Sequence, residues 1–251
     1  MKTSPLIEEQ LKKYAEKGIL VPRTEKNQYL KVSYKGAGGL VPDKWNVKIY
    51  TSGSVVCVDM KILQDIAAGT LRAPDESKAV LQIDDAGWGF CLLGVMVGVC
   101  DGKRVKTDVV DVSFFQDPAY ENKEYLREYA RKGWNLVTQE FGATPETHRI
   151  EICSGYVNRS LKALLRDRGY EVNVVEVKGL LQDDLERLFR EYVERVLGED
   201  LGYDPKELME QGGKSKVAWA YKKVLNWGYQ HAPHLLKTGW KSLGDNLPNR
   251  R

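Results

Sequence analysis

Two adjacent carboxylates, Asp84 and Asp85, end an apolar stretch that has the composition of a buried strand. The glycine-flanked tryptophan of Gly87-Trp88-Gly89 follows, and a second apolar run then extends to residue 100. Moving a carboxylate out of water costs free energy unless a cation or hydrogen-bond donors replace the water. We therefore expect a cation, a hydrogen-bonding loop or solvent beside this pair, although a simple strand-ending turn also favours Asp and Gly.

Further acids occur at two later positions in the chain. Glu151 lies between two isoleucines in a short apolar segment, so it needs a partner, for which Arg149 and Lys178 are candidates. Asp183 and Asp184 open a charged segment with helical periodicity. Acidic residues at a helix N-terminus are also favoured by the helix dipole alone, which is the alternative explanation for that pair.

If these carboxylates converge, their mutual repulsion amounts to several kcal/mol in a partly buried site, and a divalent cation removes it. Mg²⁺ and Mn²⁺ prefer carboxylate and water oxygens, and a pair of such ions can hold the attacking water and the leaving oxygen of a phosphodiester. The hypothesis is metal-assisted phosphodiester hydrolysis. Its expected catalytic residues are Asp84, Glu151, Asp183 and Asp184, and its expected metal ligands are Asp84, Asp85, Glu151 and Asp184.

The hydrophobic periodicity beyond residue 78 predicts three consecutive strands, a long helix and then alternating strands and helices. The predicted segments are strands 80–85, 92–100 and 105–115, helix 117–141, strand 149–153, helix 157–168, strand 170–177 and helix 182–197. The order β-β-β-α-β-α-β-α is similar to that of the ribonuclease H-like fold, an α/β fold with a mixed sheet. In that fold the first and fourth strands are parallel neighbours. This implies that Asp84 and Glu151 face one another across one ladder spacing, about 4.8 Å.

The rest of the chain divides around this region. Residues 1–70 predict a small α+β N-terminal domain, a substrate-binding-like module built from helix 6–17, strands 29–35, 45–50 and 55–58, and helix 60–68. The mixture of Gly, Pro and charged residues in 69–78 indicates a linker. The ribonuclease H-like domain is then expected over 79–198, and a basic, aromatic C-terminal extension over 199–251.

The segment that starts Asp84-Asp-Ala-Gly-Trp-Gly resembles the first motif of ribonucleases HII and HIII, where Asp-Glu-x-Gly-Arg/Thr-Gly precedes an apolar strand. The resemblance implies that the acids bind metal and that the glycine loop reads a ribose 2′-hydroxyl. Asp85 stands where that family has Glu, Trp88 where it has Arg or Thr, and Glu151 where its fourth strand has Asp.

Two further resemblances involve other parts of the sequence. Glu151, followed by the pair Asp183-Asp184, is closer to the pattern of bacterial Holliday-junction resolvases. Residues 45–56 resemble a segment in the N-terminal domain of ribonuclease HIII, a small sheet related to the TATA-binding protein that grips substrate.

The C-terminal extension combines cations with aromatic rings, the two components of a nucleic-acid surface. Its cations are Lys214, Lys216, Lys222, Lys223, Lys237, Lys241, Arg250 and Arg251, and its rings are Trp219, Tyr221, Trp227, Tyr229 and Trp240. An amphipathic helix that packs its tryptophans on the domain gives the same pattern. The expected nucleic-acid contacts are Gly87, Trp88, Gly89, Lys178, Lys222, Lys223 and Trp227.

Composition adds broad limits. The 251 residues are 42% hydrophobic and 29% charged, with a net charge of +3, which is typical of a globular protein and too small to identify a polyanionic partner. The charged N-terminus and the lack of a long apolar run predict a cytoplasmic protein with no membrane segment. The four scattered cysteines predict reduced thiols.

The sequence therefore predicts a Mg²⁺- or Mn²⁺-dependent nuclease that acts on RNA–DNA hybrid or on branched or single-stranded DNA. A non-catalytic nucleic-acid-binding or assembly protein with the same fold is the alternative. An actin-like phosphotransferase also begins with an Asp-containing strand and a glycine-rich hairpin, but that architecture repeats the fold twice and this chain has room for it once.

Overall fold

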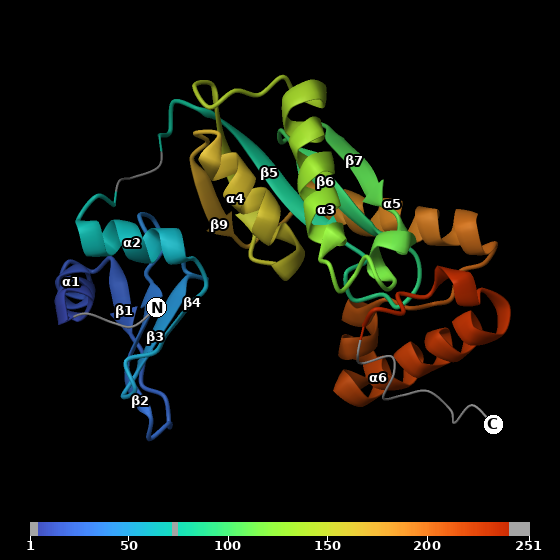
Figure 1. Ribbon diagram of the computed structural model, residues 1–251, viewed down its shortest axis with the longest axis horizontal. Coiled ribbons are helices and arrows are strands. Elements are labelled where there is room, and N and C mark those ends of the chain that lie inside the picture. Colours follow the sequence, from blue (N-terminus) through green and yellow to red (C-terminus); the bar gives the residue numbers. More distant parts are fainter. Residues whose placement is uncertain (1–4, 72–74, 241–251) are drawn as a thin grey trace.

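The computed structural model describes residues 5–71 and 75–240, which form two β-sheets with flanking helices (Figure 1). The first sheet is antiparallel, in the order β1-β2-β3-β4. Its strands are β1 (Leu20–Pro22), β2 (Leu30–Gly36), β3 (Asn46–Tyr50) and β4 (Val55–Cys57). Helices α1 (Pro5–Glu16) and α2 (Met60–Ala68) bury apolar side chains in the same core as this sheet.

The second sheet has the order β7-β6-β5-β8-β9. Its strands are β5 (Ala79–Ala86), β6 (Val95–Cys100), β7 (Val105–Val110), β8 (His148–Cys153) and β9 (Val172–Val175). Strands β5, β6 and β7 form an antiparallel meander, and β8 and β9 add to β5 in parallel. A meander extended by two parallel strands on the side of its first strand is the ribonuclease H-like arrangement, as the sequence predicted.

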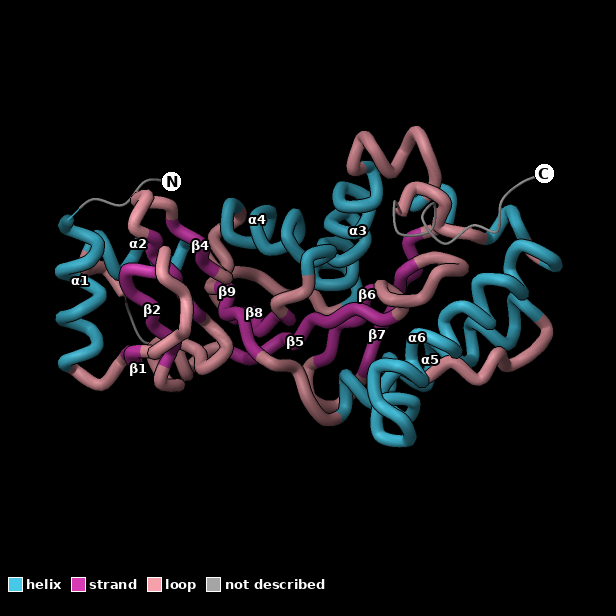
Figure 2. Tube along the Cα trace, turned by 90° about the horizontal axis from the view of Figure 1, so that it is seen from below, coloured by secondary structure: helices cyan, strands magenta, loops and turns pink. Residues whose placement is uncertain are grey.

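Helices cover both faces of this sheet (Figures 1 and 2). On one face, α3 (Glu124–Asn135) and α4 (Arg159–Asp167) pack on a core that includes the fully buried Tyr129 and Leu161. On the other face, α5 (Leu180–Leu197) lies along β5 and β6 and buries Leu181 and Leu185. Leu185 sits directly over Gly98, where a Cβ would come within 2.7 Å of the leucine side chain.

The C-terminal part returns to the second sheet. Helix α6 (Pro205–His231) is broken at Gly212 and Gly213 and is followed by a 3₁₀ turn, η4 (Pro233–Leu235). Residues 232–240, which we call the C-terminal strap, are hydrogen-bonded to the chain after β5 and to Phe115. The bonds are Leu93 N to Leu235 O (2.8 Å), Lys237 N to Cys91 O (2.9 Å) and Gly239 N to Phe115 O (3.0 Å).

Several details differ from the sequence prediction, and three of them have a clear physical reason. The third strand of the second sheet ends at Val110 rather than at residue 115, because Asp111 accepts a hydrogen bond from Ser113 N and starts a 3₁₀ turn, η1 (Val112–Phe115). The helix predicted from residue 117 begins at Glu124, after Lys123 in the left-handed conformation (φ 56°). The short strand β1 was not predicted, because three residues carry too little alternation to be recognised.

Within the described residues, no helix has both the length and the apolar composition needed to cross a membrane.

Candidate metal centre

The register of the two central parallel strands brings three candidate ligands together. Pairing of β5 with β8 runs from Ala79 opposite His148 to Ile83 opposite Ile152, so the next residues, Asp84 and Cys153, are neighbours. Carboxylate oxygens of Asp84 and Asp85 and the sulfur of Cys153 all lie within 4.8 Å of one another. We call these two acids of β5 and the thiol of the neighbouring strand β8 the Asp–Asp–Cys cluster.

Glu151 lies outside this cluster. The register pairs it with Gln82, whose Nε2 donates to Glu151 Oε2 at 3.4 Å. The expectation that Glu151 faces Asp84 is therefore wrong by two residues along the strand. Of the two partners considered for Glu151, Arg149 is the one used, with an Nη1 to Oε1 distance of 2.8 Å, whereas Lys178 pairs with Glu176.

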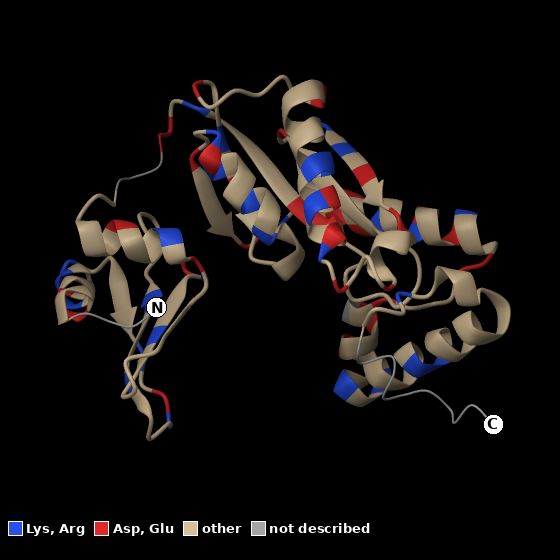
Figure 3. Cartoon of the chain, viewed as in Figure 1, with Lys and Arg blue, Asp and Glu red and all other residues tan. Residues whose placement is uncertain are grey.

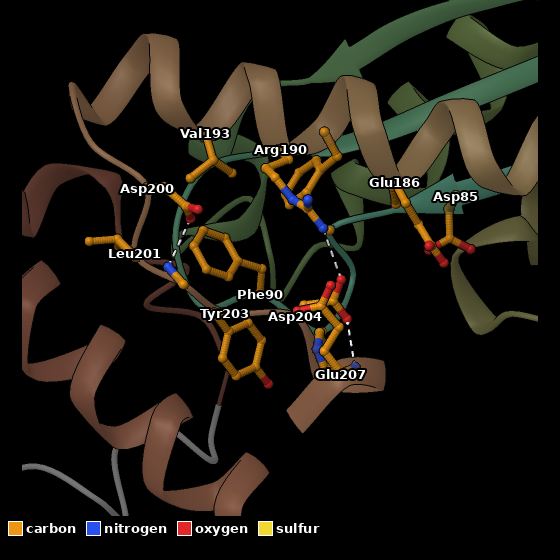
Figure 4. Close-up of a pocket in the computed structure, with 16 residues that line it drawn as sticks. Asp85, Phe90, Glu186, Arg190, Val193, Asp200, Leu201, Tyr203, Asp204 and Glu207 are labelled. Atoms are coloured by element: carbon orange, nitrogen blue, oxygen red, sulfur yellow. Dashed lines mark hydrogen bonds and ion pairs between the residues drawn. The ribbon is translucent and has the colours of Figure 1, made fainter. Parts of the chain in front are cut away.

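The acidic pair on α5 also points elsewhere. Asp183 is exposed in the first turn of the helix, and Asp184 pairs with Arg187 at 3.0 Å on the same helix. Asp184 lies near Cys100 of β6. Cys100 is the register partner of Gln82, two residues before Asp84 on β5, so Asp184 is displaced from the cluster along the strands. The helix passes the cluster further along, where Glu186 lines the same cavity as Asp85 and its carboxylate points toward that of Asp85 (Figure 4).

That cavity has a volume of about 430 Å³ and lies between the segment after β5, α5 and the loop that leads into α6. Phe90, Phe189 and Tyr203 form aromatic walls, with Phe90 5.8 Å from each of the other two ring centroids. The acids that line it are Asp85, Glu186, Asp200, Asp204 and Glu207. Arg190, the one basic residue among the described residues that line it, is paired with Asp204 at 3.0 Å. An excess of carboxylates disfavours a phosphate there unless a cation neutralises them.

The cluster is strongly perturbed electrostatically. Burial raises the pKa of Asp85 to about 7, and the neighbouring charge of Asp84 adds to the rise while Lys237 and Asn158 oppose it. Burial also raises the pKa of the Cys153 thiol to about 12, with a further contribution from Asp84. Burial and the two aspartates hold the pKa of Tyr129, whose hydroxyl donates to the backbone oxygen of Asp84 (3.4 Å), well above its usual value. Without a bound cation, the cluster therefore favours protonated groups.

A buried lysine lies beside the cluster. Lys237 on the C-terminal strap is fully buried, and its Nζ donates to Gly87 O at 2.6 Å. The ammonium also lies 5.1 Å from the ring centroids of Phe115 and of Trp240, which is cation–π distance. Burial lowers its pKa to about 7. The sequence had placed Lys237 among the cations of a nucleic-acid surface, and this was wrong because the strap turns it inward.

The three expected contacts in the glycine segment differ from one another. Gly87 has φ 85° and is packed so closely that a Cβ would lie 2.2 Å from the Phe189 ring. Trp88 is partly buried among the aromatic rings Phe115, Tyr125, Tyr156 and Trp240. Gly89 is exposed, and a Cβ added there would have no atom of the described residues within 4 Å beyond its chain neighbours. Of the three residues, Gly89 is therefore the one open to a ligand.

Of the remaining expected contacts, Lys178 is exposed after β9 and pairs with Glu176 at 3.2 Å. The other three lie on α6, whose basic residues are visible in Figure 3. Lys222 and Lys223 are exposed, and the Lys223 ammonium lies 5.8 Å from the Trp219 ring, which is 63% exposed. Trp227 stacks on His231 and donates to Glu199 Oε1 at 2.8 Å. Trp219 is thus more accessible for base stacking than Trp227. The cations predicted at Lys241, Arg250 and Arg251 lie outside the described residues.

The cluster has features that fit a divalent cation. Its donor set contains two carboxylates and a thiol, all of which are metal ligands in proteins. Gly155 leaves room at Asp85, because a Cβ there would lie 2.9 Å from Asp85 Oδ1. The fully buried Asn158, whose Nδ2 donates to Asp85 Oδ1 at 3.3 Å, has an Oδ1 without a hydrogen-bond partner within the described part of the chain.

Sequence reasoning missed Cys153, Glu186 and Asn158. Glu151 and Cys153 are two residues apart and therefore lie on the same side of β8. Either could have met Asp84, because the sequence does not fix the register between β8 and β5. Glu186 lies three residues before Phe189, on the side of α5 that reaches the segment after β5. That helical spacing was the available signal for Glu186.

The strand order, the strand directions and the acidic cluster define a protein with a ribonuclease H-like fold. No protein-family model matches the chain, and no curated protein matches it. Among solved structures, it is similar to RNase H3 of Aquifex aeolicus, with 15% identity over 86% of this chain and 96% of that chain and a TM-score of 0.30. A glutamine-to-alanine mutant of Bst-RNase HIII shows 13% identity over 90% and 97% of the two chains and a TM-score of 0.35.

Bst-RNase HIII in complex with Mn²⁺ shows 14% identity over 92% and 98% of the two chains, with a TM-score of 0.30. The ribonuclease H-like fold is shown by the strand order and strand directions of the second sheet. The resemblance to Holliday-junction resolvases remains a prediction.

Proposed function

We propose that this protein is a divalent-metal-dependent nuclease that hydrolyses phosphodiester bonds, with the Asp–Asp–Cys cluster as its metal centre. The observation that carries the proposal is the convergence of Asp84, Asp85 and Cys153 within 4.8 Å at the ends of two central strands. Among the described residues, this is the one group of three or more His, Cys, Asp and Glu side chains with such spacing.

In this proposal Asp84, Asp85 and Cys153 hold the ion, which supplies positive charge for the phosphate and lowers the pKa of a bound water. Glu186 is positioned beside Asp85 to hold a proton or orient water. The exposed backbone at Gly89 allows close approach of the substrate. Lys222, Lys223 and Trp219 on α6 are a candidate contact for phosphates and an unpaired base.

The proposed substrates are those that the sequence predicted. RNA–DNA hybrid and branched or single-stranded DNA all present phosphodiesters that a metal ion can bind. We propose the N-terminal sheet as a second contact. Val47 and Ile49 of β3 face the core, so Lys48 lies on the opposite side of the sheet, where it pairs with Glu25. Lys35 of β2 lies on that same side and is exposed, which makes it the more available cation.

A cleavage panel tests the proposal. The full chain is incubated with RNA–DNA hybrid, four-way DNA junction, single-stranded DNA and single-stranded RNA, in separate reactions with Mg²⁺, Mn²⁺, Co²⁺ or Zn²⁺. Asp84→Asn should abolish cleavage while shifting the thermal midpoint by only a few degrees, because the side chain keeps its shape and loses its charge. The matched control, Asp167→Asn at the exposed end of α4, should cleave as the wild type does. Activity that survives in Asp84→Asn would refute this site.

One observation favours a non-catalytic nucleic-acid-binding protein as the second candidate. Lys237 and Lys162 both place positive potential on Asp85, so the chain already provides cations next to its acids. If wild-type protein binds the panel substrates but cleaves none of them with any ion, this second candidate is the correct one.

A further inference from the structure

The Asp–Asp–Cys cluster contains the sulfur of Cys153, whereas a site for Mg²⁺ would have only oxygen ligands. Cys153 is the last residue of β8, and its Sγ faces Asp84 and Asp85. Cys91 and Cys100, in contrast, are buried as ordinary small apolar side chains in hydrophobic clusters. Cys153 is only partly buried, so it is accessible from the cluster as well as from the apolar residues behind it.

A donor set of two carboxylates and one thiol selects among metal ions. Mg²⁺ takes oxygen ligands in octahedral geometry and binds sulfur poorly, whereas Zn²⁺ and its substitute Co²⁺ bind thiolate strongly. Catalytic zinc sites typically have three protein ligands and leave the fourth position to water. Asp84, Asp85 and Cys153 supply that number.

Asn158 gives an independent indication of a cation at this place. It is fully buried, its amide contacts Asp85, and its Oδ1 has no hydrogen-bond partner in the described structure. A half-turn of the amide would direct Oδ1 toward Asp85 instead of Nδ2. Two oxygens in that arrangement repel one another unless a cation lies between them, and a cation would satisfy the unpaired oxygen.

We infer that the Asp–Asp–Cys cluster binds a thiophilic divalent ion of the Zn²⁺ or Co²⁺ class through the Cys153 sulfur, in preference to Mg²⁺. The inference rests on the proposed function only in taking the cluster as a metal site, and it stands or falls on binding rather than on cleavage. It also replaces the all-oxygen site that the sequence predicted.

Co²⁺ absorption spectroscopy on the full, reduced chain tests the inference directly. A cobalt–thiolate bond produces a charge-transfer band in the near ultraviolet that oxygen ligands do not give. The wild type should develop this band, saturating at one Co²⁺ per chain, and added Zn²⁺ should displace the cobalt. Cys153→Ser should lose the band, and its Zn²⁺ affinity, measured by isothermal titration, should fall by more than about tenfold, because even the loss of a group that only hydrogen-bonds to a ligand costs about that much.

Cys57→Ser is the matched control, because Cys57 is also partly buried but lies in the N-terminal sheet, with its Sγ against Asp59 O. This variant should keep both the band and the Zn²⁺ affinity. Cys153→Asp provides a second test that does not depend on losing a signal. The variant supplies an oxygen ligand in place of sulfur, so the relative affinity of the cluster for metal ions should shift from Zn²⁺ and Co²⁺ toward Mg²⁺ and Mn²⁺.

The outcomes separate this inference from the proposed function. Co²⁺ binding without a thiolate band, or a band that survives in Cys153→Ser, overturns the inference and leaves an oxygen-ligand metal site in place. Binding of Mg²⁺ or Mn²⁺ with no binding of Co²⁺ or Zn²⁺ overturns it in the same way. Binding of none of the four ions overturns both the inference and the proposed metal centre.

Discussion

At the scale of single residues, the site contains two ionisable side chains, Asp85 and Lys237, whose burial disfavours their charged forms. Asp85 and Lys237 are opposite in sign, but Lys237 is hydrogen-bonded to Gly87 O and Asp85 accepts from Asn158. The pKa of each has moved to about 7, upward for the acid and downward for the base. Near neutral pH both groups are therefore poised to change charge in the folded protein.

Lys237 makes a pH-dependent contribution to stability that can be measured. Its folded pKa of about 7 lies below the ordinary value of 10.5, so between these values the unfolded chain binds more protons than the folded chain. The penalty for burying this amine consequently shrinks as pH rises from 7 toward 10.5, with a slope of up to about 1.4 kcal/mol per pH unit.

Urea unfolding of wild type and Lys237→Met between pH 7 and 9 measures that contribution. As the pH rises, the unfolding free energy of the wild type should increase relative to that of Lys237→Met. Lys222→Met, an exposed substitution on α6, should run parallel to wild type. A pH-independent difference for Lys237→Met would show that the buried amine does not titrate in this range.

The candidate ligands show what sequence can and cannot give at this scale. Asp84 and Asp85 were predicted, because two acids that end an apolar strand are conspicuous. Cys153 was predicted only as a reduced thiol, whereas Glu151 was predicted as a ligand. Both residues lie on one side of β8, and only the register with β5 determines which of them meets Asp84. Register is set by packing over the whole sheet and not by the local residues.

At the scale of elements, the glycine segment after β5 is held by the approach of α5. The ring of Phe189 occupies the space where a side chain at Gly87 would begin, and Gly87 also has positive φ. Gly89, two residues on, has neither constraint. Gly87 is therefore required by its backbone conformation and by the packing of Phe189, whereas neither requirement applies to Gly89.

Alanine substitutions at these two positions should show this difference. Gly87→Ala combines a strained backbone with a clash against an aromatic ring and should lower the free energy of unfolding by about 1–3 kcal/mol. Gly89→Ala should change it by less than about 0.5 kcal/mol. Thermal or chemical unfolding of both variants provides the comparison, and equal effects would mean that Phe189 does not restrict the segment.

The strands of the second sheet and its flanking helices were predicted from the sequence because strands and helices differ in hydrophobic periodicity, although the end of β7 and the start of α3 were misplaced. Their strand order was also predicted, from the similarity of the element order to a known fold. The placement of α5 against the sheet was not predicted, because the same hydrophobic periodicity is compatible with more than one placement. The observed placement brings Glu186 into the cavity beside Asp85, whereas Asp184 pairs with Arg187.

At the scale of the whole molecule, the two sheets are connected by polar contacts of different burial. Asp59, which caps α2 by accepting from Lys61 N, also pairs with Arg166 on α4, and the Asp59 side chain is only 3% exposed. Lys44 and Glu176 form a second link at 3.0 Å with both side chains well exposed. No local pattern in the sequence predicted either pair, because each joins residues more than a hundred positions apart.

These links should differ in strength. Arg166→Met leaves the Asp59 carboxylate buried without its partner and should increase hydrogen exchange throughout α2 by at least about tenfold, since breaking a buried pair is costly. Lys44→Met removes an exposed pair and should have little effect. Exchange measured by mass spectrometry on both variants tests this, and similar rates in α2 would assign the attachment of the first sheet to other contacts.

The contact between Lys237 and Gly87 joins residues 150 positions apart. During synthesis on a ribosome, β5, its two aspartates and the glycine segment emerge long before the lysine that braces them. A nascent chain can therefore pair its central strands early, but the surroundings of Asp85 are complete only after Lys237 has been translated. Premature termination between Leu197, where α5 ends, and Lys237 would leave every strand of the sheet in the polypeptide but remove the lysine that braces its acidic centre.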